Sequence, residues 1–413
     1  MERRQMMFGL AAAGAVREAP LPDASLALRQ PEKYWARIRK EQFLLPGWRA
    51  FLNNGSLGLA PRPVLAAVTG YLEKSAALDL EEYDYPRWGY ELMEAHRKEM
   101  AEYLGCRMEE LALVHNATEA LSTIAAGIEL KAGDEVVMTD QEHASGKAGW
   151  AVRRARHGVV VREVSIPLPP KDRGELVERM VSAIGPRTRV LFFSGILSPT
   201  GLVMPVREIC DAARAKGVIT VVDGAHMNGQ IAMRIEDLGC DYYAGSPHKW
   251  MFAPAGCGIL WGREEMLERL WPSMVTGGWD KKEDKAARFM KMGTNNRAIF
   301  EGMLAGVRFA RAVGVERIYG RVHELARKAR EKAQGLGYVK LLTPEDDRMY
   351  GGLVGMEFEK EHFERLFGLC RKRRIWILRA SRLRLSTHIH TRPQDLDLFF
   401  EAVAESRRER SNG

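Results

Sequence analysis

Short apolar runs alternate with amphipathic stretches over the middle of this 413-residue chain. Strands that alternate with helices pair mainly in parallel through right-handed crossovers, and they form an open sheet that helices cover on both faces. Ligands of such sheets bind at the carboxyl ends of the strands, where loops lead into helices. The pattern therefore predicts an α/β fold with a mainly parallel sheet. The apolar runs are residues 111–115, 134–139, 159–166, 189–195, 218–225, 240–246 and 256–262.

The pattern changes after about Asn296, where the chain becomes longer charged helical stretches with a few strand-like pieces. We expect a large domain over residues 56–296 and a smaller α+β domain built from residues 23–55 and 297–413. The cleft between two such domains is the expected substrate site, because ligand pockets occur preferentially at domain interfaces.

The first 22 residues are read separately as a leader. Arg3 and Arg4 precede an uncharged stretch from Gln5 to Val16, an arrangement that resembles a short twin-arginine export signal. The alternative is a disordered leader on a cytoplasmic enzyme. No later stretch is apolar for long enough to span a bilayer, so no membrane partner is expected.

The net charge of +8 would suit binding to a polyanion only if the excess were gathered on one face. The basic runs are dispersed through polar helical stretches, which favours solvated helix faces over a nucleic-acid surface. The five cysteines are far apart and show no paired ligand spacing, so we expect neither a metal site nor a disulfide framework.

Two ionisable residues follow neighbouring strands of the predicted sheet. Asp223 ends the run VITVVD, and Lys249 lies just past the next run, in GSPHKW. Both are expected to open onto one edge of the sheet. A lysine amine forms an imine with an aldehyde cofactor, and a carboxylate beside a pyridine nitrogen keeps that ring protonated. Alone, however, such a pair is weak, because surface loops carry many of both residues.

A second candidate lies in VHNATEA, where Asn116, Ala117 and Thr118 occupy a strand-to-helix turn. The first turn of a helix offers unpaired backbone N–H groups and the positive end of the helix dipole, which together bind phosphate. The alternative is that Thr118 only caps the helix.

The lysine segment Ser246-Pro247-His248-Lys249-Trp250, followed by Ala253-Pro254-Ala255-Gly256, resembles that of the class V aminotransferase family. Its HKW continuation is similar to the isopenicillin N epimerase-like branch. The resemblance runs from about Asn53 to about Leu398. It implies fold type I of the pyridoxal 5′-phosphate (PLP) enzymes, with PLP as the cofactor and an amino acid as the small-molecule substrate.

The resemblance also assigns roles to individual residues. It implies that Lys249 holds PLP as a Schiff base, that Asp223 protonates the pyridine ring, and that His143 stacks over the ring and moves protons. His226 would contact the ring hydroxyl. The implied phosphate contacts are Asn116, Ala117, Thr118, Ser246 and His248.

Further roles are implied for substrate binding and for a homodimer. Arg384 matches the arginine that binds the substrate carboxylate, because Arg384-Leu385-Ser386 meets the pattern arginine, any residue, serine; Arg382 and Arg379 are close competitors. Asn53 is a second substrate-binding candidate. In relatives, segments like those containing Thr276, Gly277 and Thr294 reach the phosphate of the neighbouring subunit.

The motifs leave the reaction open. Loss of the α-proton to Lys249 can lead to epimerisation, transamination or β-elimination. We expect an amino-acid epimerase or aminotransferase. The alternatives are a carbon-sulfur β-lyase and a non-catalytic PLP-fold binding protein. The intact set of Lys249, Asp223, His143 and Arg384 argues against the non-catalytic protein.

Three other features bear on the substrate. Cys370 lies in a charged helical stretch, and little room for a mobile loop remains between residues 378 and 382, so no persulfide chemistry is expected. Gly195 stands where many relatives have a histidine or an asparagine, which puts the substrate in doubt. The aromatic segment from Glu81 to Tyr90 either lines the pocket or packs as an amphipathic helix.

Overall fold

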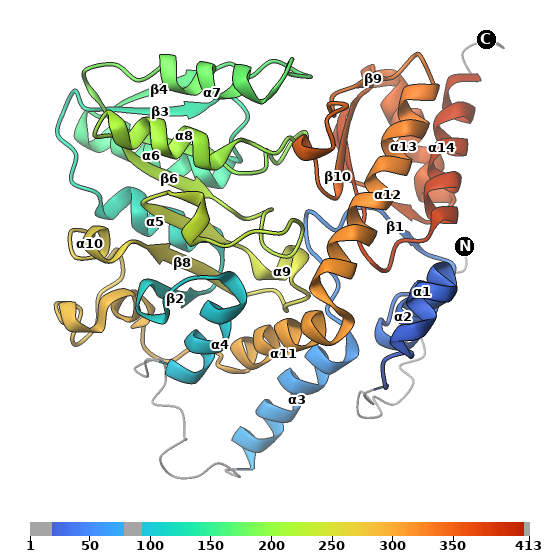
Figure 1. The fold of residues 1–413 in the computed structure, drawn as a ribbon, viewed down its shortest axis with the longest axis horizontal. Helices are drawn as coiled ribbons and strands as arrows, with labels where there is room; N and C mark the ends of the chain where they lie inside the picture. Colours follow the sequence, from blue (N-terminus) through green and yellow to red (C-terminus); the bar gives the residue numbers. More distant parts are fainter. Residues whose placement is uncertain (1–18, 78–92, 409–413) are drawn as a thin grey trace, which may run out of the picture.

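The computed structural model describes residues 19–77 and 93–408. The leader with Arg3 and Arg4 and the aromatic segment of residues 81–90 lie outside these ranges. The described chain contains two clusters of buried apolar side chains. The first surrounds a seven-stranded sheet, and the second surrounds two small sheets formed mainly by the C-terminal part of the chain. Figure 1 shows the seven-stranded sheet beside this C-terminal part.

The seven strands are ordered β2-β8-β7-β6-β5-β3-β4. Neighbours from β7 to β4 are parallel, whereas β8 runs antiparallel to both β2 and β7. This confirms the predicted α/β fold with a mainly parallel sheet. The strands are β2 Leu111–Val114, β3 Glu135–Thr139, β4 Val160–Val164, β5 Thr188–Ser194, β6 Ile219–Asp223, β7 Tyr242–Gly245 and β8 Gly258–Gly262.

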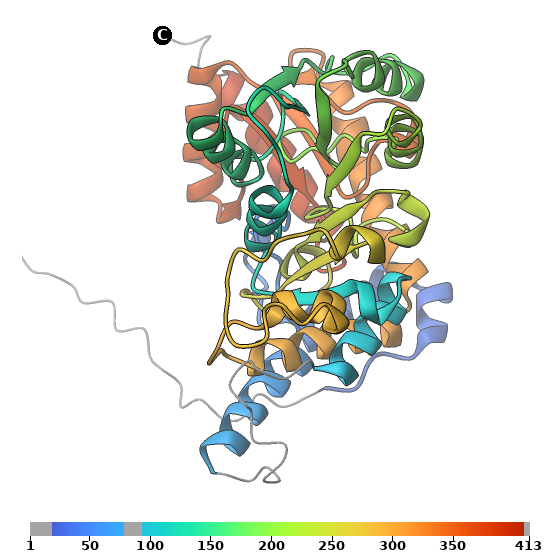
Figure 2. The same cartoon turned by 90° about the vertical axis from the view of Figure 1, so that its left-hand side faces the viewer.

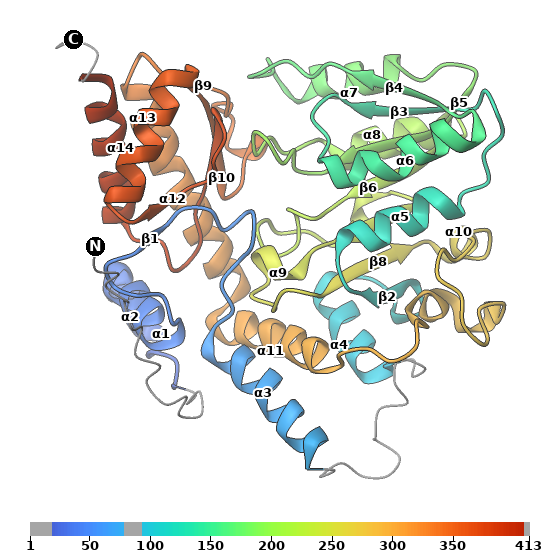
Figure 3. The same ribbon diagram turned by 180° about the vertical axis from the view of Figure 1, so that it is seen from behind.

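Helices cover both faces of this sheet, with α5 and α6 on one face and α7 and α8 on the other (Figures 1 and 3). In α8 the buried residues recur at the spacing of one helix face: Val206, Ile209, Cys210 and Ala213. The helices of this part are α4 Glu94–Leu104, α5 Ala117–Gly127, α6 Ala144–His157, α7 Arg173–Ser182, α8 Val206–Ala215, α9 Pro247–Trp250 and α10 Glu264–Leu267.

The C-terminal part is built on a three-stranded antiparallel sheet, ordered β12-β10-β9, and on a parallel pair formed by β1 and β11. The pair includes the segment just before Asn53, and Asn53 itself forms a β-bridge with Ser386. The elements are β1 Ala50–Phe51, α12 Val315–Gly335, β9 Lys340–Leu341, β10 Leu353–Glu357, α13 Lys360–Lys372, β11 Ile375–Trp376, β12 Arg382–Ser386 and α14 Pro393–Arg408.

The remaining helices lie along the lower side of the molecule in the view of Figure 1. They are α1 Ala24–Arg29, α2 Pro31–Gln42, α3 Arg62–Ala76 and α11 Ala298–Val313, and short 3-10 segments cover Met108–Glu110, Glu236–Leu238, Lys282–Met290 and Asp347–Met349. Helix α3 lies along α11, as Figures 1 and 2 show from two sides. Tyr34 of α2 and Phe300 of α11 belong to the first apolar cluster. The domain boundaries at residues 55 and 297 stay a prediction.

Among the described helices, none has the length and the apolar character that crossing a membrane requires.

Candidate active site

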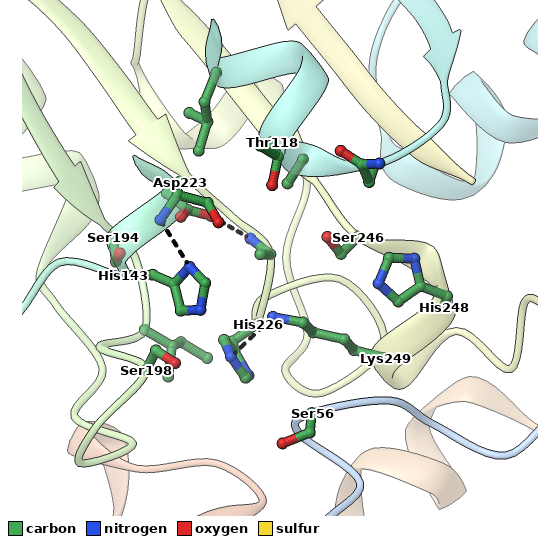
Figure 4. A pocket seen from close by; sticks show the side chains of 16 residues that line it. Ser56, Thr118, His143, Ser194, Ser198, Asp223, His226, Ser246, His248 and Lys249 are labelled. Carbon is green, nitrogen blue, oxygen red and sulfur yellow. Dashed lines mark hydrogen bonds between the residues drawn. The ribbon is translucent and has the colours of Figure 1, made fainter. Parts of the chain in front are cut away.

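A cavity of about 210 Å³ opens at the carboxyl ends of the parallel strands (Figure 4). Its walls come from the ends of β5 and β6, from the starts of α5 and α9, and from the turn before α3. All nine predicted cofactor residues that precede Thr276 line it. The lining residues are Ser56, Asn116, Ala117, Thr118, Leu121, His143, Ser145, Ser194, Ile196, Ser198, Asp223, Ala225, His226, Ser246, His248 and Lys249.

Asp223 ends β6 at the floor of the cavity. It is the register partner of Ser194 on β5 and of Ala244 on β7, so its place is set by the sheet. Its Oδ1 accepts a hydrogen bond from the backbone N–H of Ala225 at 2.9 Å. Burial raises the pKa of the Asp223 carboxyl, while the charge of Lys249 opposes that rise. A proton donor in the cavity would therefore find a strong acceptor in Asp223.

Lys249 lies on α9, and two contacts hold its backbone. Asn54 donates to its carbonyl oxygen at 2.8 Å, and Gly58 comes so close that a β-carbon there would lie 2.1 Å from the same oxygen. Burial lowers the pKa of the Lys249 amine to about 8, although nearby Asp223 acts to raise it. Near physiological pH a minority of the amine is therefore neutral, far more than at the ordinary lysine pKa of 10.5, and the neutral amine is the nucleophilic form.

The phosphate end of the cavity is the first turn of α5. Asn116, rather than Thr118, caps this helix, because its side chain accepts the N–H of Glu119 at 2.9 Å. The N–H groups of Ala117 and Thr118 have no acceptor within the helix because of their position in it. A β-carbon at Gly258 would lie 2.5 Å from the Asn116 backbone, so this glycine lets the turn approach β8.

His143 caps α6, and its Nδ1 accepts the N–H of Ser145 at 3.2 Å. Burial lowers the pKa of the His143 ring, and the charge of Lys249 adds to this effect. The neutral ring therefore carries its proton on Nε2. This leaves His143 able to exchange a proton with a ligand in the cavity.

Glu142 is a buried residue that the sequence reasoning missed. Its Oε2 lies 2.5 Å from Oγ of Ser194, and its Oε1 accepts the N–H of Ser194 at 3.1 Å and the hydroxyl of Thr139 at 2.5 Å. Burial, together with the charge of Asp223, raises the pKa of Glu142 to about 7. Its position directly before His143, at the end of a strand, was the available signal.

Arg384 lies on β12 and is not among the residues that line the cavity, but it contacts three that are: Ser56, Ser198 and His226. Its Nη1 donates to the carbonyl oxygen of Ser198 at 2.6 Å and to Oγ of Ser198 at 2.5 Å, and its Nη2 donates to Oγ of Ser56 at 3.3 Å. The side chain is 5% exposed, and its Nε has no partner among the described residues. Burial lowers the pKa of Arg384 to about 10. The competing arginines Arg379 and Arg382 are exposed and face Glu364 and Glu357.

The other predicted site residues lie away from the cavity. Asn53 contacts it only through Ser56, whose hydroxyl donates to Oδ1 of Asn53 at 2.8 Å. Thr276 is half-buried, and its hydroxyl donates to the carbonyl of Lys291; Gly277 and Thr294 are exposed. Their predicted contact with a neighbouring subunit stays a prediction. Within residues 19–77 and 93–408, no group of three histidine, cysteine or acidic side chains is placed to hold a metal ion.

These residues fit PLP. The N–H groups of Ala117 and Thr118 suit its phosphate, Asp223 suits its pyridine nitrogen, and the readily deprotonated amine of Lys249 suits its aldehyde. The buried Nε of Arg384 without a partner points to an anionic ligand in addition, because a buried donor left unpaired costs free energy.

Solved structures of similar fold include a cysteine desulfurase and a cystine C-S lyase. The apo cysteine desulfurase from Thermococcus onnurineus matches with a TM-score of 0.78 and 23% identity, covering 90% of this chain and 98% of that one. A cystine C-S lyase in complex with cysteine persulfide matches with a TM-score of 0.77 and 24% identity, covering 86% and 97%. They confirm the predicted fold type.

Curated relatives are closer in sequence. An isopenicillin N epimerase from Amycolatopsis lactamdurans is 34% identical over 396 residues, which cover 90% of this chain and 98% of the relative. The isopenicillin N epimerase of Streptomyces clavuligerus is 32% identical, covering 85% and 93%. A probable cysteine desulfurase of Xylella fastidiosa is 29% identical, covering 74% and 77%.

The family model for class V aminotransferases matches residues 50–381. This span includes the whole lining of the cavity. Together with the identity to the epimerases over most of their length, the match confirms the predicted resemblance and the PLP cofactor. The chain therefore belongs to the class V aminotransferase family of PLP-dependent enzymes.

Proposed function

We propose that this enzyme removes and returns the α-proton of an α-amino acid, as an epimerase of the isopenicillin N epimerase-like group. The observation that carries the proposal is a contact that both residues share: Nζ of Lys249 lies 3.2 Å and Nη1 of the buried Arg384 lies 3.3 Å from Nε2 of His226. The relatives that cover nearly all of this chain at 32–34% identity support the choice of epimerisation.

The free edge of Arg384 is suited to a carboxylate. Nη1 contacts Ser198 and His226, whereas Nε has no partner among the described residues and Nη2 makes one long bond to Ser56. The Nε–Nη2 edge therefore remains to bind both oxygens of a substrate carboxylate side by side. Burial makes this ion pair strong, because little water competes for the guanidinium.

Lys249 is the proposed base for the α-proton. Its lowered pKa leaves the amine able to accept a proton at Nζ near neutral pH and to give it back. His143 reaches the cavity from a different strand end and is the proposed second proton carrier, through Nε2. PLP, when bound, supplies an electron sink for the charge left at the α-carbon. Asp223 would hold the proton on the pyridine nitrogen.

A second candidate is carbon-sulfur bond cleavage, which the desulfurase relatives favour. Persulfide chemistry on Cys370 is poorly supported, because this thiol is fully buried in the second apolar cluster and burial raises its pKa to about 12. No cysteine lines the cavity in the described part of the chain. A β-lyase needs no such thiol, so product analysis must separate the two reactions.

The test is a panel of amino acids given to the PLP-loaded enzyme in deuterated water. We expect deuterium at the α-carbon and mixed configuration without net consumption. Net release of pyruvate and a thiol would replace the proposal with β-elimination, and an α-keto acid with aminated cofactor would replace it with transamination. Borohydride reduction followed by peptide mass spectrometry should label Lys249; an unlabelled Lys249 peptide would remove the proposal altogether.

A further inference from the structure

A second cavity, of about 340 Å³, opens where β1 and β11 begin, and its lining shares no described residue with that of the active-site cavity. Its volume falls in the range of sites for small molecules. Four of its eight lining residues are arginines, and the others are apolar or aromatic. The cavity is thus basic and apolar at once. The four arginines are Arg49, Arg371, Arg374 and Arg379.

The positive charge of this cavity is largely uncompensated. Of its four arginines, only Arg379 has an acidic partner among the described residues, Glu364, whose Oε2 lies 3.5 Å from its Nη2. Arg373, in the same basic run, turns to Glu405 and does not line the cavity. Guanidinium groups gathered in one concavity repel one another and create a positive potential that attracts anions.

Strand pairing places two of the uncompensated arginines side by side. Ala50 of β1 is the register partner of Ile375 of β11, and the N–H of Ala50 donates to the carbonyl oxygen of Arg374 at 3.3 Å. Arg49 and Arg374 directly precede these partners, so they are neighbours at the start of the parallel pair. Like charges placed side by side on paired strands are destabilising. The stability of the pair therefore gives no reason for two arginines here.

The backbone of Arg374 is strained as well. Its φ is 61°, in the left-handed region, directly after Arg373, which caps the C-terminal end of α13. Helices usually have glycine at this position, because a β-carbon is unfavourable there. The dipole of α13 favours a cation in its last turn and accounts for Arg371, but it does not require the strain at Arg374. Strained residues of this kind are concentrated at ligand sites.

Exposed aromatic rings accompany these guanidinium groups. Trp376, which lines the cavity, is 53% exposed, and Trp48 is 54% exposed. The guanidinium carbon of Arg49 lies 4.9 Å from the ring centroid of Trp48 and 5.6 Å from that of Trp376. That of Arg374 lies 4.5 Å from the centroid of Trp48. Planar ligands stack on such rings and guanidinium planes, and arginine binds phosphate oxygens in pairs.

We propose that this cavity binds a phosphate ester of a planar ring compound, of the mononucleotide class, outside the active site. Several arginines suit a phosphate dianion better than a single carboxylate, and the aromatic side chains suit the ring. A longer nucleic acid fits less well, because Glu364 and Glu405 adjoin the arginines and interrupt the basic surface. The site depends neither on the reaction proposed above nor on its base, so borohydride labelling of Lys249 tests that function separately.

Isothermal titration calorimetry of the full-length holoenzyme tests the site, because bound PLP keeps phosphate probes out of the active site. Adenosine, guanosine and uridine monophosphates are the probes. We expect at least one of them to bind with one equivalent per chain. Adenosine and inorganic phosphate should each bind at least tenfold more weakly than that nucleotide, because each offers half of the recognised chemistry. Absence of binding by all three nucleotides, or equal binding of inorganic phosphate, would overturn the proposal.

Arg374→Gly is the decisive variant. It removes one guanidinium and supplies the residue that the left-handed conformation favours, so the thermal midpoint should stay the same or rise. The affinity for the nucleotide should nevertheless fall about tenfold or more, the equivalent of one charged hydrogen bond. Arg49→Gln should weaken binding to a similar degree without touching that backbone. Nucleotide affinity at the wild-type level in both variants would contradict the assignment.

Lys372→Gln is the matched control. This lysine is exposed, lies in the last turn of α13 and does not line the cavity. Its substitution removes the same charge from the same helix end, so the affinity should change less than twofold. Equal losses in Lys372→Gln and Arg374→Gly would show general attraction by net charge in place of a site. An oligothymidylate of ten residues that binds more than a hundredfold tighter than the mononucleotides would also overturn the proposal, in favour of nucleic acid.

Discussion

Nη1 of Arg384 donates to both the carbonyl and the hydroxyl oxygen of Ser198, and this pair joins strand β12 of the C-terminal sheet to the loop after β5. The contact orients the guanidinium and leaves its Nε–Nη2 edge for a ligand. An arginine fixed by one edge and free on the other loses little side-chain entropy when a carboxylate binds.

Arg384→Gln should lower kcat/KM for amino acids by roughly 100-fold, since hydrogen bonds to charged groups contribute about 1.5–3 kcal/mol each. Most of the loss should be in KM. Steady-state kinetics measure this loss, with an amino acid that exchanges its α-proton for deuterium as the substrate. Arg382→Gln is the matched control, because this arginine lies on the same strand, is exposed and pairs with Glu357. Equal losses in both variants would contradict the assignment.

The lowered pKa of Lys249 predicts how cofactor-free enzyme captures PLP. Only the neutral amine attacks an aldehyde, so the capture rate should rise with pH to a midpoint of about 8 rather than at the ordinary 10.5. Asp223→Asn should move the midpoint lower, because the carboxylate stabilises the ammonium form. Stopped-flow absorbance over a pH series tests both statements. A midpoint near the ordinary lysine value would show that the amine is solvated.

Glu142 predicts a pH-dependent stability. A carboxyl whose pKa rises on folding stabilises the fold below the ordinary pKa of 4.5, and this contribution is lost as pH rises through about 7. Glu142→Gln keeps the contacts and never ionises. Its stability relative to the wild type should therefore improve between pH 5 and 8, by on the order of 3 kcal/mol.

Urea unfolding at a series of pH values measures this difference, and Glu135→Gln is the control. The pKa of Glu135 is lowered, first by its hydrogen bond from Arg162, so this carboxyl titrates below its ordinary range and not near pH 7. The cost of Glu135→Gln should be constant over the same range. If Glu142→Gln also differed from the wild type by a constant amount, Glu142 would be ionised throughout.

Gly195 predicts a packing conflict in the pocket wall. A β-carbon there would lie 2.1 Å from Sδ of the buried Met227. Gly195→Ala should therefore cost about 1–3 kcal/mol of stability through overpacking. Combined with Met227→Ala, it should cost less than the sum of the two single changes, because the space is vacated. Strict additivity in thermal unfolding would refute the conflict.

Much of the site's location follows from one property of parallel sheets. Asp223 and Lys249 follow neighbouring strands, and the structure places both at the carboxyl edge, where the sequence predicts them. The helix turn at Asn116 could be predicted from the sequence in the same way. An apolar strand, a capping residue and a helix with regularly spaced apolar residues follow one another there. Their catalytic roles stay predictions.

The residues missed by the sequence reasoning depend on approaches between distant segments. Ser56 and Ser198 reach the cavity only because the turn before α3 and the loop after β5 converge on Arg384. The local spacing of apolar residues carries no information about contacts between such distant segments. The antiparallel direction of β8 was also hidden, because an apolar run reads the same whichever way its strand is oriented.

Lys249 and Arg384 are carried by different apolar clusters, the lysine beside Trp250 of the first and the arginine on a strand of the second. A substrate that bonds to both therefore spans two separately packed bodies, which also meet at the bridge between Leu202 and Tyr350. The way the two clusters meet therefore sets the separation between the group that would hold the cofactor and the group that would bind the carboxylate. A substitution at the Leu202–Tyr350 bridge can change this separation, with every reacting group left intact.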